Sequence, residues 1–215
     1  MKQLILNEER FGVKSITPLF KEKEEQGIAV ISRYHYKDKD NVLFNLRSMR
    51  DGGYMFRMYD GHYCRLLING KLMMSDTGLE RISNKEFIDN ANGRVLIAGL
   101  GLGLIIHNII DREDISEIIV IEKYRDVIDL VSPKFTHPKL KIICADIFEW
   151  KPSKGEKFDT IYFDIWADIG TDNLEEMKKL SSKFKSFLNR LNPKCWMNSW
   201  MKEYLQKMKR RESRY

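Results

Sequence analysis

The feature that most constrains the fold is a near-continuous apolar run, RVLIAG at 94–99, that leads directly into a glycine-rich segment. Such a run is typical of a strand buried on both faces of a parallel sheet. Further strands are expected at EIIVIE, KIICAD, FDTIYFD and CWMNSW, and helices at 102–111, 123–131, 173–188 and 201–211. This alternation predicts an α/β fold with a Rossmann-like, doubly wound, mostly parallel sheet.

The chain before this sheet has the pattern of a small antiparallel β domain. GIAVISRYHY, NVLFNLRSM and YMFRMY are β-branched or aromatic runs broken by Asp, Asn and Gly. In CRLLINGKLMM two apolar runs flank Asn69 and Gly70, the pair that a type I′ hairpin turn prefers. KEKEE at 21–25 is expected as a solvated turn or helix end. We therefore expect a β-rich domain over residues 1–80 and an α/β domain over residues 81–215.

The glycine-rich segment has the form GxGxG, with Gly99, Gly101 and Gly103. Glycine at these places permits a tight turn, close approach of a ligand to the backbone, and free amides at a helix N-terminus. The dinucleotide fingerprint GxGxxG would require glycine where Leu104 stands, which argues against NAD. The same glycines can also serve helix–strand packing alone.

An acidic residue ends each of the next three expected strands. Glu122 lies 19 residues beyond Gly103, a distance at which a carboxylate can accept both hydroxyls of a ribose. Asp146 suits an adenine amino group, with Ile147 or Phe148 over the ring; the alternative is a helix N-cap. Together with the glycines, this order points to an adenosine-containing ligand at the carboxyl ends of the strands.

The fourth strand ends at Asp164, where a carboxylate has no reason to lie in the core and is expected to face the cleft. Trp166 is either a pocket wall or core, and Asp168 caps the following turn or faces the site. Lys123, directly after Glu122, is either a surface residue or a cofactor contact.

Composition excludes several other classes. The three cysteines form no CxxC pair and the four histidines are scattered, so neither a disulfide scaffold nor a metal site is expected, and the default compartment is cytoplasmic. No signal peptide or membrane span is expected. Six Lys and Arg against two Glu make the last fourteen residues basic. We expect a solvated helix there, with nucleic-acid contact as the alternative.

Four segments, VLIAGLGLG, VIEKYRDVIDLV, ICADIFEW and FDTIYFDIWAD, resemble class I S-adenosylmethionine-dependent methyltransferases. Within that superfamily the chain is most similar to the spermidine synthase-like branch, including its short, functionally undefined members. A further similarity to this branch lies in LLINGKLMMSDTGLERISNKEFI, just before the glycine-rich segment. It contains an expected hairpin and, at Asn84–Phe87, a run similar to the DEF sequence motif of aminopropyltransferases. The resemblance covers about residues 62–200.

The resemblance implies a role for each motif residue. The three glycines would hold the methionine part of the cofactor, Glu122 the ribose and Asp146 the adenine, with Lys123 and Ile147 beside them. Asp164 would face the amino acid end of the cofactor or the acceptor, and would be the catalytic residue. Asp76 would close over the cofactor from the hairpin, and Trp166 and Asp168 would lie on the substrate side.

The chain also departs from aminopropyltransferases. Leu102 stands where they carry Asp in GGGDG, and DIWAD replaces their DSSDP-type run. Only 51 residues follow Asp164, so we expect a sheet shortened to about five strands, without the terminal hairpin. The expected function is therefore methyl transfer to an unknown small-molecule acceptor, with an amine as one candidate. The alternatives are aminopropyl transfer with decarboxylated S-adenosylmethionine, and a non-catalytic nucleotide-binding module, with a homodimer through the N-terminal β domain as a further expectation.

Overall fold

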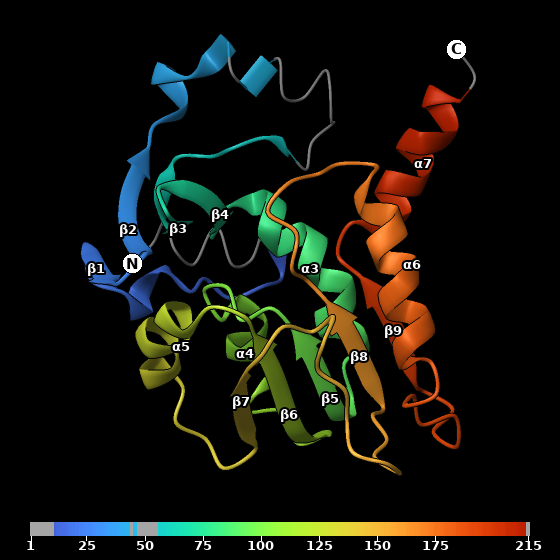
Figure 1. Cartoon of the computed structure of the whole chain (residues 1–215). Coiled ribbons are helices and arrows are strands. Elements are labelled where there is room, and N and C mark those ends of the chain that lie inside the picture. Colours follow the sequence, from blue (N-terminus) through green and yellow to red (C-terminus); the bar gives the residue numbers. More distant parts are fainter. Residues whose placement is uncertain (1–10, 44, 47–55, 214–215) are drawn as a thin grey trace.

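The computed structural model describes residues 11–43, 45–46 and 56–213 and contains two separate sheets (Figure 1). The larger is five-stranded and all parallel, in the order β7-β6-β5-β8-β9. Its strands are β5 (Gly93–Ala98), β6 (Ile115–Glu122), β7 (Leu140–Cys144), β8 (Thr160–Phe163) and β9 (Trp196–Ser199). The expected Rossmann-like α/β fold and the expected number of about five strands are confirmed.

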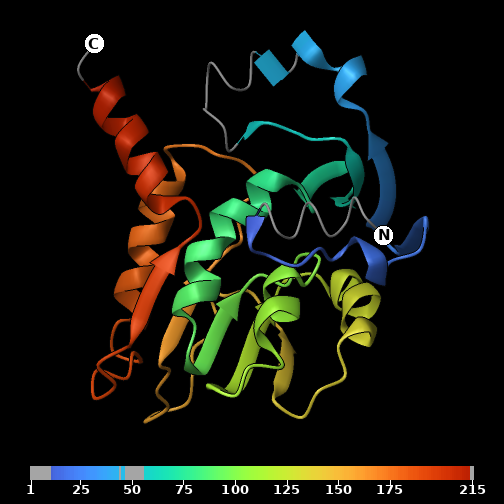
Figure 2. The same cartoon turned by 180° about the vertical axis from the view of Figure 1, so that it is seen from behind.

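The strand order reverses between β5 and β8, which makes this the switch point of a doubly wound sheet. Helices α4 (Leu104–Ile109) and α5 (Arg125–Val131) connect β5 to β6 and β6 to β7, and the short η4 (Ser132–Lys134) follows α5. Helix α6 (Asn173–Phe184) connects β8 to β9 on the opposite face (Figures 1 and 2). Right-handed crossovers require this arrangement, and it opens a crevice at the carboxyl ends of the two central strands.

The apolar strands fold as their sequence predicts because both faces of the sheet are covered. Val95, Leu96, Ile97 and Ala98 of β5 are all fully buried, and β6 is buried at its last five positions. Helix α6 presents Met177, Leu180 and Phe184 to the sheet, at the spacing of one helical face.

The smaller sheet is antiparallel, in the order β1-β2-β3-β4. Its strands are β1 (Lys23–Gln26), β2 (Ala29–Tyr36), β3 (Gly61–Ile68) and β4 (Lys71–Ser75), and the short helices η1 (Thr17–Leu19) and η2 (Asp38–Asp40) flank β1 and β2. Asn69 and Gly70 have φ of 50° and 75°, which confirms the primed turn.

Two expectations about this part are wrong. Residues 23–26 form the edge strand β1 rather than a turn or helix end, because Glu24 pairs with Lys134 and the backbone pairs with β2. In NVLFNLRSM the described residues 42, 43, 45 and 46 are helical, and in YMFRMY residues 56–59 are outside any strand. The rest of these two runs, residues 44, 47–49, 54 and 55, lies outside the described part.

Helix α3 (Gly78–Asn90) joins the two sheets and was not expected from the sequence. Its hydrophobic residues do not follow a clear helical stripe; its buried face includes Arg81 and Asn84 beside Phe87 and Ile88. Because α3 begins at Gly78, it runs across the expected boundary at residue 80. That boundary, and the homodimer expected through the β domain, stay predictions.

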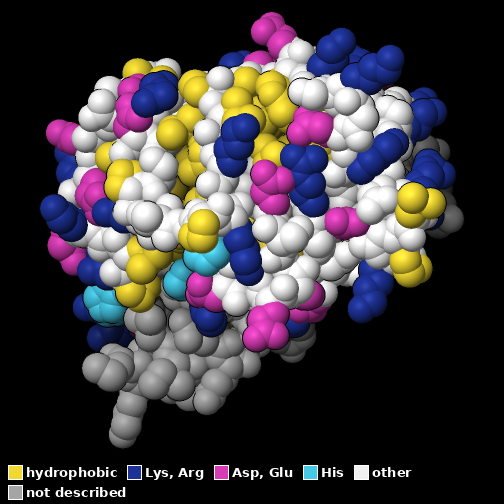
Figure 3. Space-filling view, turned by 90° about the horizontal axis from the view of Figure 1, so that it is seen from below, with side chains coloured by type: hydrophobic (Ala, Val, Ile, Leu, Met, Phe, Trp, Pro, Cys, Tyr) yellow, Lys and Arg dark blue, Asp and Glu magenta, His cyan; other side chains and the backbone are white. Residues whose placement is uncertain are grey.

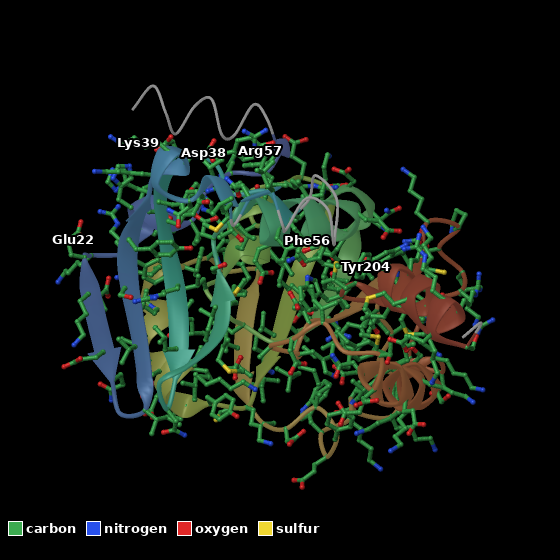
Figure 4. All side chains as sticks on the ribbon, turned by 90° about the horizontal axis from the view of Figure 1, so that it is seen from above. Glu22, Asp38, Lys39, Phe56, Arg57 and Tyr204 are labelled. Atoms are coloured by element: carbon green, nitrogen blue, oxygen red, sulfur yellow. The ribbon has the colours of Figure 1, made fainter. Side chains whose placement is uncertain are left out.

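The antiparallel sheet lies over the carboxyl ends of the parallel strands (Figures 1 and 2). Glu24 of β1 accepts from Lys134 Nζ at 2.8 Å, and the amide of Ile28 donates to Asp126 of α5 at 3.0 Å. On the other side the rings of Phe56 and Tyr204 lie 5.9 Å apart, so the chain entering β3 contacts helix α7 (Lys202–Glu212) (Figure 4). These contacts hold the small sheet as a roof over the crevice.

The surface seen from the amino ends of the parallel strands carries Lys and Arg interspersed with Asp and Glu (Figure 3). The basic residues of α7 are mostly exposed, as expected for a solvated helix. Among the described residues no helix has the length and apolar character needed to cross a bilayer, and no three His, Cys, Asp or Glu converge as metal ligands.

Candidate active site

A cavity of about 270 Å³ lies at the carboxyl ends of β5, β6, β7 and β8, below the antiparallel sheet. Its floor is the glycine loop and the acidic strand ends, and its roof is Leu66, Ile68, Met73 and Met74. The remaining wall includes Glu80 of α3 and Glu176 of α6. The cavity is thus at the switch point, where the strand order predicts a ligand.

The glycines of the loop have two different functions. Gly99 and Gly101 line the cavity with φ of 98° and 51°, and a Cβ on them would meet the Asp164 carbonyl oxygen at 2.0 Å and Met74 Sδ at 2.2 Å. Gly103, with φ of 78°, precedes α4, and its Cβ would meet the Phe135 ring at 2.3 Å. Gly103 is outside the cavity lining, so its backbone serves packing and the start of α4.

The roof depends on an irregularity in the hairpin. Leu66 pairs with Met74 and Leu67 with Leu72, so Met73 is an extra residue in β4. Side chains normally alternate along a strand, but this bulge lets Met73 and Met74 both face the cavity. Met74 Sδ also accepts a hydrogen bond from the Leu102 amide at 3.0 Å, which joins the roof to the loop.

Glu122 lies in the floor at the end of β6 and is 7 % exposed. Its two carboxylate oxygens accept from the amides of Leu100 and Tyr124, each at 2.8 Å. Burial raises the pKa of Glu122, although the surrounding backbone amides oppose the shift. The amides of Lys123 and Gly101 also act on this carboxylate, so the backbone holds it in the floor of the cavity.

Asp146 lies beside Glu122 at the end of β7. Its carboxylate accepts from the Phe148 amide and forms an ion pair with Lys123 at 2.9 Å. The hydrogen bond from Lys123, followed by that from the amide, lowers the pKa of Asp146. Ile147 and Phe148 complete this corner, with Ile147 buried.

Asp164 lies at the end of β8, opposite Glu80 on the first turn of α3, and both line the cavity. Burial raises the pKa of Asp164 to about 7, opposed by a hydrogen bond from Asn84. Burial also raises the pKa of Glu80 well above its usual value, and the charge of Asp164 adds to the shift. Two carboxyl groups whose ionisation is disfavoured therefore share this end of the cavity.

The structure places the three substrate-side candidates differently. Trp166 lines the cavity, and its indole donates to Glu176 at 2.8 Å. Asp168 is exposed and outside the lining. Asp76 is fully buried outside it: its carboxylate accepts from Ser15 and Thr17 of the N-terminal segment, and from Arg81 Nε at 2.8 Å.

Several lining residues were not found from the sequence: Glu80, Met73, Met74, Tyr124 and Glu176. Glu80 needs a helix that the hydrophobic pattern does not indicate, and Met73 needs a bulge. The methionines could have been found from the hairpin, which was expected near the cofactor. Glu176 falls in a correctly predicted helix, but nothing in its spacing marks it.

No family model matches the chain, and no curated protein matches it. Among solved structures it is similar to the plantazolicin methyltransferase BpumL in complex with SAH, at 17% identity and a TM-score of 0.36. It is similar to an S-adenosylmethionine-dependent methyltransferase from Clostridium acetobutylicum ATCC 824, at 19% identity and a TM-score of 0.35. It is also similar to the N-methyltransferase NodS from Bradyrhizobium japonicum WM9, at 14% identity and a TM-score of 0.40.

These matches cover 50%, 49% and 51% of this chain, and 39%, 43% and 62% of the respective neighbours. The chain therefore spans less than two thirds of the length of each. All three neighbours are methyltransferases.

Proposed function

We propose that this protein is an S-adenosylmethionine-dependent methyltransferase that acts on a small amine. The observation that carries the proposal is the position of Glu122: a buried carboxylate beside the glycine loop, in the floor of a cavity at the switch point. A carboxylate at that place suits the two hydroxyls of a ribose.

The residues present fit such a cofactor. Gly99 and Gly101 leave backbone without Cβ at the cavity wall, where an amino acid tail would lie. Asp146 offers an acceptor for an exocyclic amine, with Ile147 and Phe148 as an apolar surface for the ring. The cavity volume, about 270 Å³, is near the lower end for small-molecule sites.

When bound, the cofactor supplies a methyl group already activated on a sulfonium. The protein is then required to align the acceptor and to keep water out. Leu66, Ile68 and the two methionines of the roof exclude water from above. Asp164 lines the cavity beside Gly99, where its carboxylate orients an amine and accepts its proton.

Aminopropyl transfer from the decarboxylated cofactor is a second candidate. The acidic end of the cavity, with Asp164 and Glu80, favours it because its acceptors are amines. The two candidates differ in the cofactor's carboxylate, so the choice of cofactor separates them.

The test is calorimetric titration with S-adenosylmethionine, S-adenosylhomocysteine and decarboxylated S-adenosylmethionine. We expect the two carboxylated compounds to bind more tightly, and Glu122→Gln to weaken both about tenfold or more through lost hydroxyl contacts. Glu122→Gln keeps one carbonyl acceptor for the loop amides, so it is preferred to Glu122→Ala. Glu113→Gln, an exposed residue before β6, is the matched control.

Preference for the decarboxylated compound would instead support aminopropyl transfer. Absence of binding by all three compounds to the folded wild-type protein would overturn both transferase functions.

A further inference from the structure

Arg81 is the nearest residue in sequence that could neutralise Glu80, yet it is bound elsewhere. Its Nε donates to Asp76 Oδ1 at 2.8 Å and its Nη2 to the Asp76 carbonyl at 3.2 Å, and both side chains of this pair are nearly inaccessible. Among the described residues no Lys or Arg forms an ion pair with Glu80 or Asp164. Two carboxyl groups thus share one end of the cavity without a protein cation.

A second, independent observation marks the same place. Asn84, one turn after Glu80 on α3, is fully buried and donates through Nδ2 to the Glu80 carbonyl at 3.1 Å. Its Oδ1 has no hydrogen-bond partner among the described residues. A buried amide oxygen without a donor is costly, and a protonated carboxyl or a ligand N–H would satisfy it.

The other charged groups that face the pair are acidic or phenolic. Asp76 acts on Glu80 from the loop after β4, and the Tyr162 phenol of β8 lies within reach of Asp164, Glu80 and Glu86. Glu176 of α6 also lines the cavity, but its carboxylate accepts from Trp166. These neighbours disfavour two ionised carboxylates and favour a bound proton or a ligand cation.

We propose that Glu80 and Asp164 form a carboxyl pair that holds one proton between them in the resting protein and takes a second proton from an amine acceptor. The inference rests on the proposed transferase function and names Glu80 as a second participant in the handling of the acceptor. It also specifies the acceptor class: an amine that enters as an ammonium ion.

The proton and charge balance is complete. The singly charged pair attracts the ammonium ion, takes one of its protons and becomes neutral, which leaves a neutral amine. The amine lone pair forms the bond to the methyl carbon as the carbon–sulfur bond breaks, and that electron pair stays on sulfur. The positive charge moves from sulfur to the methylated nitrogen, and the pair returns its extra proton to water after release.

The first test needs no ligand. Infrared titration follows the C=O stretch of protonated carboxyls in the wild type, Glu80→Gln and Asp164→Asn, with the exposed α3 variant Asp89→Asn as control. We expect a carboxyl midpoint near neutral pH in the wild type and the control. In Asp164→Asn the remaining Glu80 carboxyl should titrate about one pH unit lower, because its like-charged partner is gone, whereas Asp164 in Glu80→Gln should keep the midpoint that burial sets.

A carboxyl raised by burial alone would keep its midpoint when the partner is replaced. A Glu80 midpoint as high in Asp164→Asn as in the wild type, or no titration near neutral pH in the wild type, would therefore overturn the pair. Circular dichroism on the same samples confirms that each variant is folded.

The second test uses wild-type protein loaded with S-adenosylhomocysteine and titrated with butylamine, against butanol as an uncharged probe. We expect butylamine to bind more tightly at pH 8 than at pH 6, and Glu80→Gln to weaken it about tenfold while butanol is unaffected. Equal binding of butylamine to Glu80→Gln and wild type, or no binding to the wild type, would overturn the amine assignment. Failure of S-adenosylhomocysteine itself to bind would count against the proposed function, while the ligand-free titration would still test the pair.

Discussion

The thioether sulfur of Met74 lies 3.0 Å from the amide nitrogen of Leu102, so a residue of the antiparallel sheet satisfies a backbone donor of the glycine loop. This contact is the most direct link between the roof of the cavity and its floor. Since a Cβ on Gly101 would lie 2.2 Å from the same sulfur, the loop approaches β4 more closely than a residue other than glycine at position 101 would permit. The roof and the floor of the cavity are therefore joined at this point.

Met74→Leu tests this link. Leucine has a similar volume but no acceptor, so the Leu102 amide loses its partner, and we expect a destabilisation of about 1 kcal/mol. Leu72→Ala, at an exposed position of the same strand, is the control and should cost less. Urea denaturation measures both. A neutral Met74→Leu would mean that the sulfur contributes packing alone.

Gly99→Ala tests the close approach between the loop and the end of β8. The new Cβ would lie 2.0 Å from the Asp164 carbonyl oxygen, on a residue with φ of 98°. Gly155→Ala is a matched control, because Gly155 has φ of 90° with no atom within 4 Å of its Cβ position. Backbone strain of about 1–2 kcal/mol is common to both variants.

We therefore expect Gly99→Ala to cost a further 1–3 kcal/mol or so from the clash, and to abolish S-adenosylhomocysteine binding because Asp164 must move. Thermal unfolding and calorimetry measure the two effects. Equal destabilisation by the two substitutions would show that the loop can shift to accommodate the methyl group.

The regions predicted correctly are those in which the local hydrophobic pattern of the sequence matches the burial of the residues in the fold. Val95–Ala98 are all apolar because β5 is covered on both faces, and the acidic residues at the strand ends meet because parallel strands end at one edge. Residues 23–26 and helix α3 were missed for the opposite reason. The edge strand β1 is polar and is fixed by Lys134, 110 residues away, and α3 buries Arg81 and Asn84, which no hydrophobic period reveals.

The site was predicted in the same uneven way. Glu122, Asp146 and Asp164 follow strands and could be read from spacing, whereas Glu80 reaches the cavity only through the packing of α3. From the sequence alone, Gly103 and Asp76 resemble ligand-binding residues. The structure places Gly103 against Phe135 and Asp76 against Arg81, outside the cavity lining, and both contacts depend on long-range packing.

Asp76→Ala is predicted to destabilise the protein rather than to impair ligand contacts directly. The change removes four hydrogen bonds to Oδ2, from residues 15–17, and leaves the buried Arg81 guanidinium without its carboxylate. Breaking such a pair costs about 3–5 kcal/mol. Asp89→Ala, which breaks the exposed pair with Lys85, should cost less than about 1 kcal/mol. Guanidinium denaturation of the two variants checks the difference.

The raised pKa of Asp164, about 7, predicts a pH dependence opposite to that of carboxylates stabilised by ion pairs or hydrogen bonds. Because the folded state binds this proton more tightly than the unfolded state, the contribution to stability is full below the unfolded pKa and is lost as pH rises toward 7. Asp146 and Asp159, whose pKa values are lowered, contribute stability that is lost on acidification. We therefore expect the free energy of unfolding of the wild type, minus that of Asp164→Asn, to fall between about pH 4 and 7. Denaturation at each pH measures this difference, and a flat profile would contradict the raised pKa.

Asp146 and Lys123 are neighbours in the site, and we predict that Asp146 contributes more than Lys123 to the affinity for S-adenosylhomocysteine. Lys123 is 62% exposed at its side chain, and its ion pair with Asp146 spans 2.9 Å at the surface. Lys123→Ala should therefore raise the pKa of Asp146 toward its ordinary value and change the affinity for S-adenosylhomocysteine by less than about threefold. Asp146→Ala removes the acceptor for the adenine amine and should weaken binding about tenfold or more.

Two probes separate adenine recognition from general damage to the site. S-adenosylhomocysteine and its inosyl analogue, which lacks the exocyclic amine, are titrated into each variant. Asp146→Ala should remove the wild-type preference for the adenosyl compound, since the contact that reads the amine is gone, whereas Lys123→Ala should retain it. If Asp146→Ala kept the preference, the carboxylate would serve to start the turn at 146–150, through its bond to the Phe148 amide, and adenine would be read by other groups of the cavity.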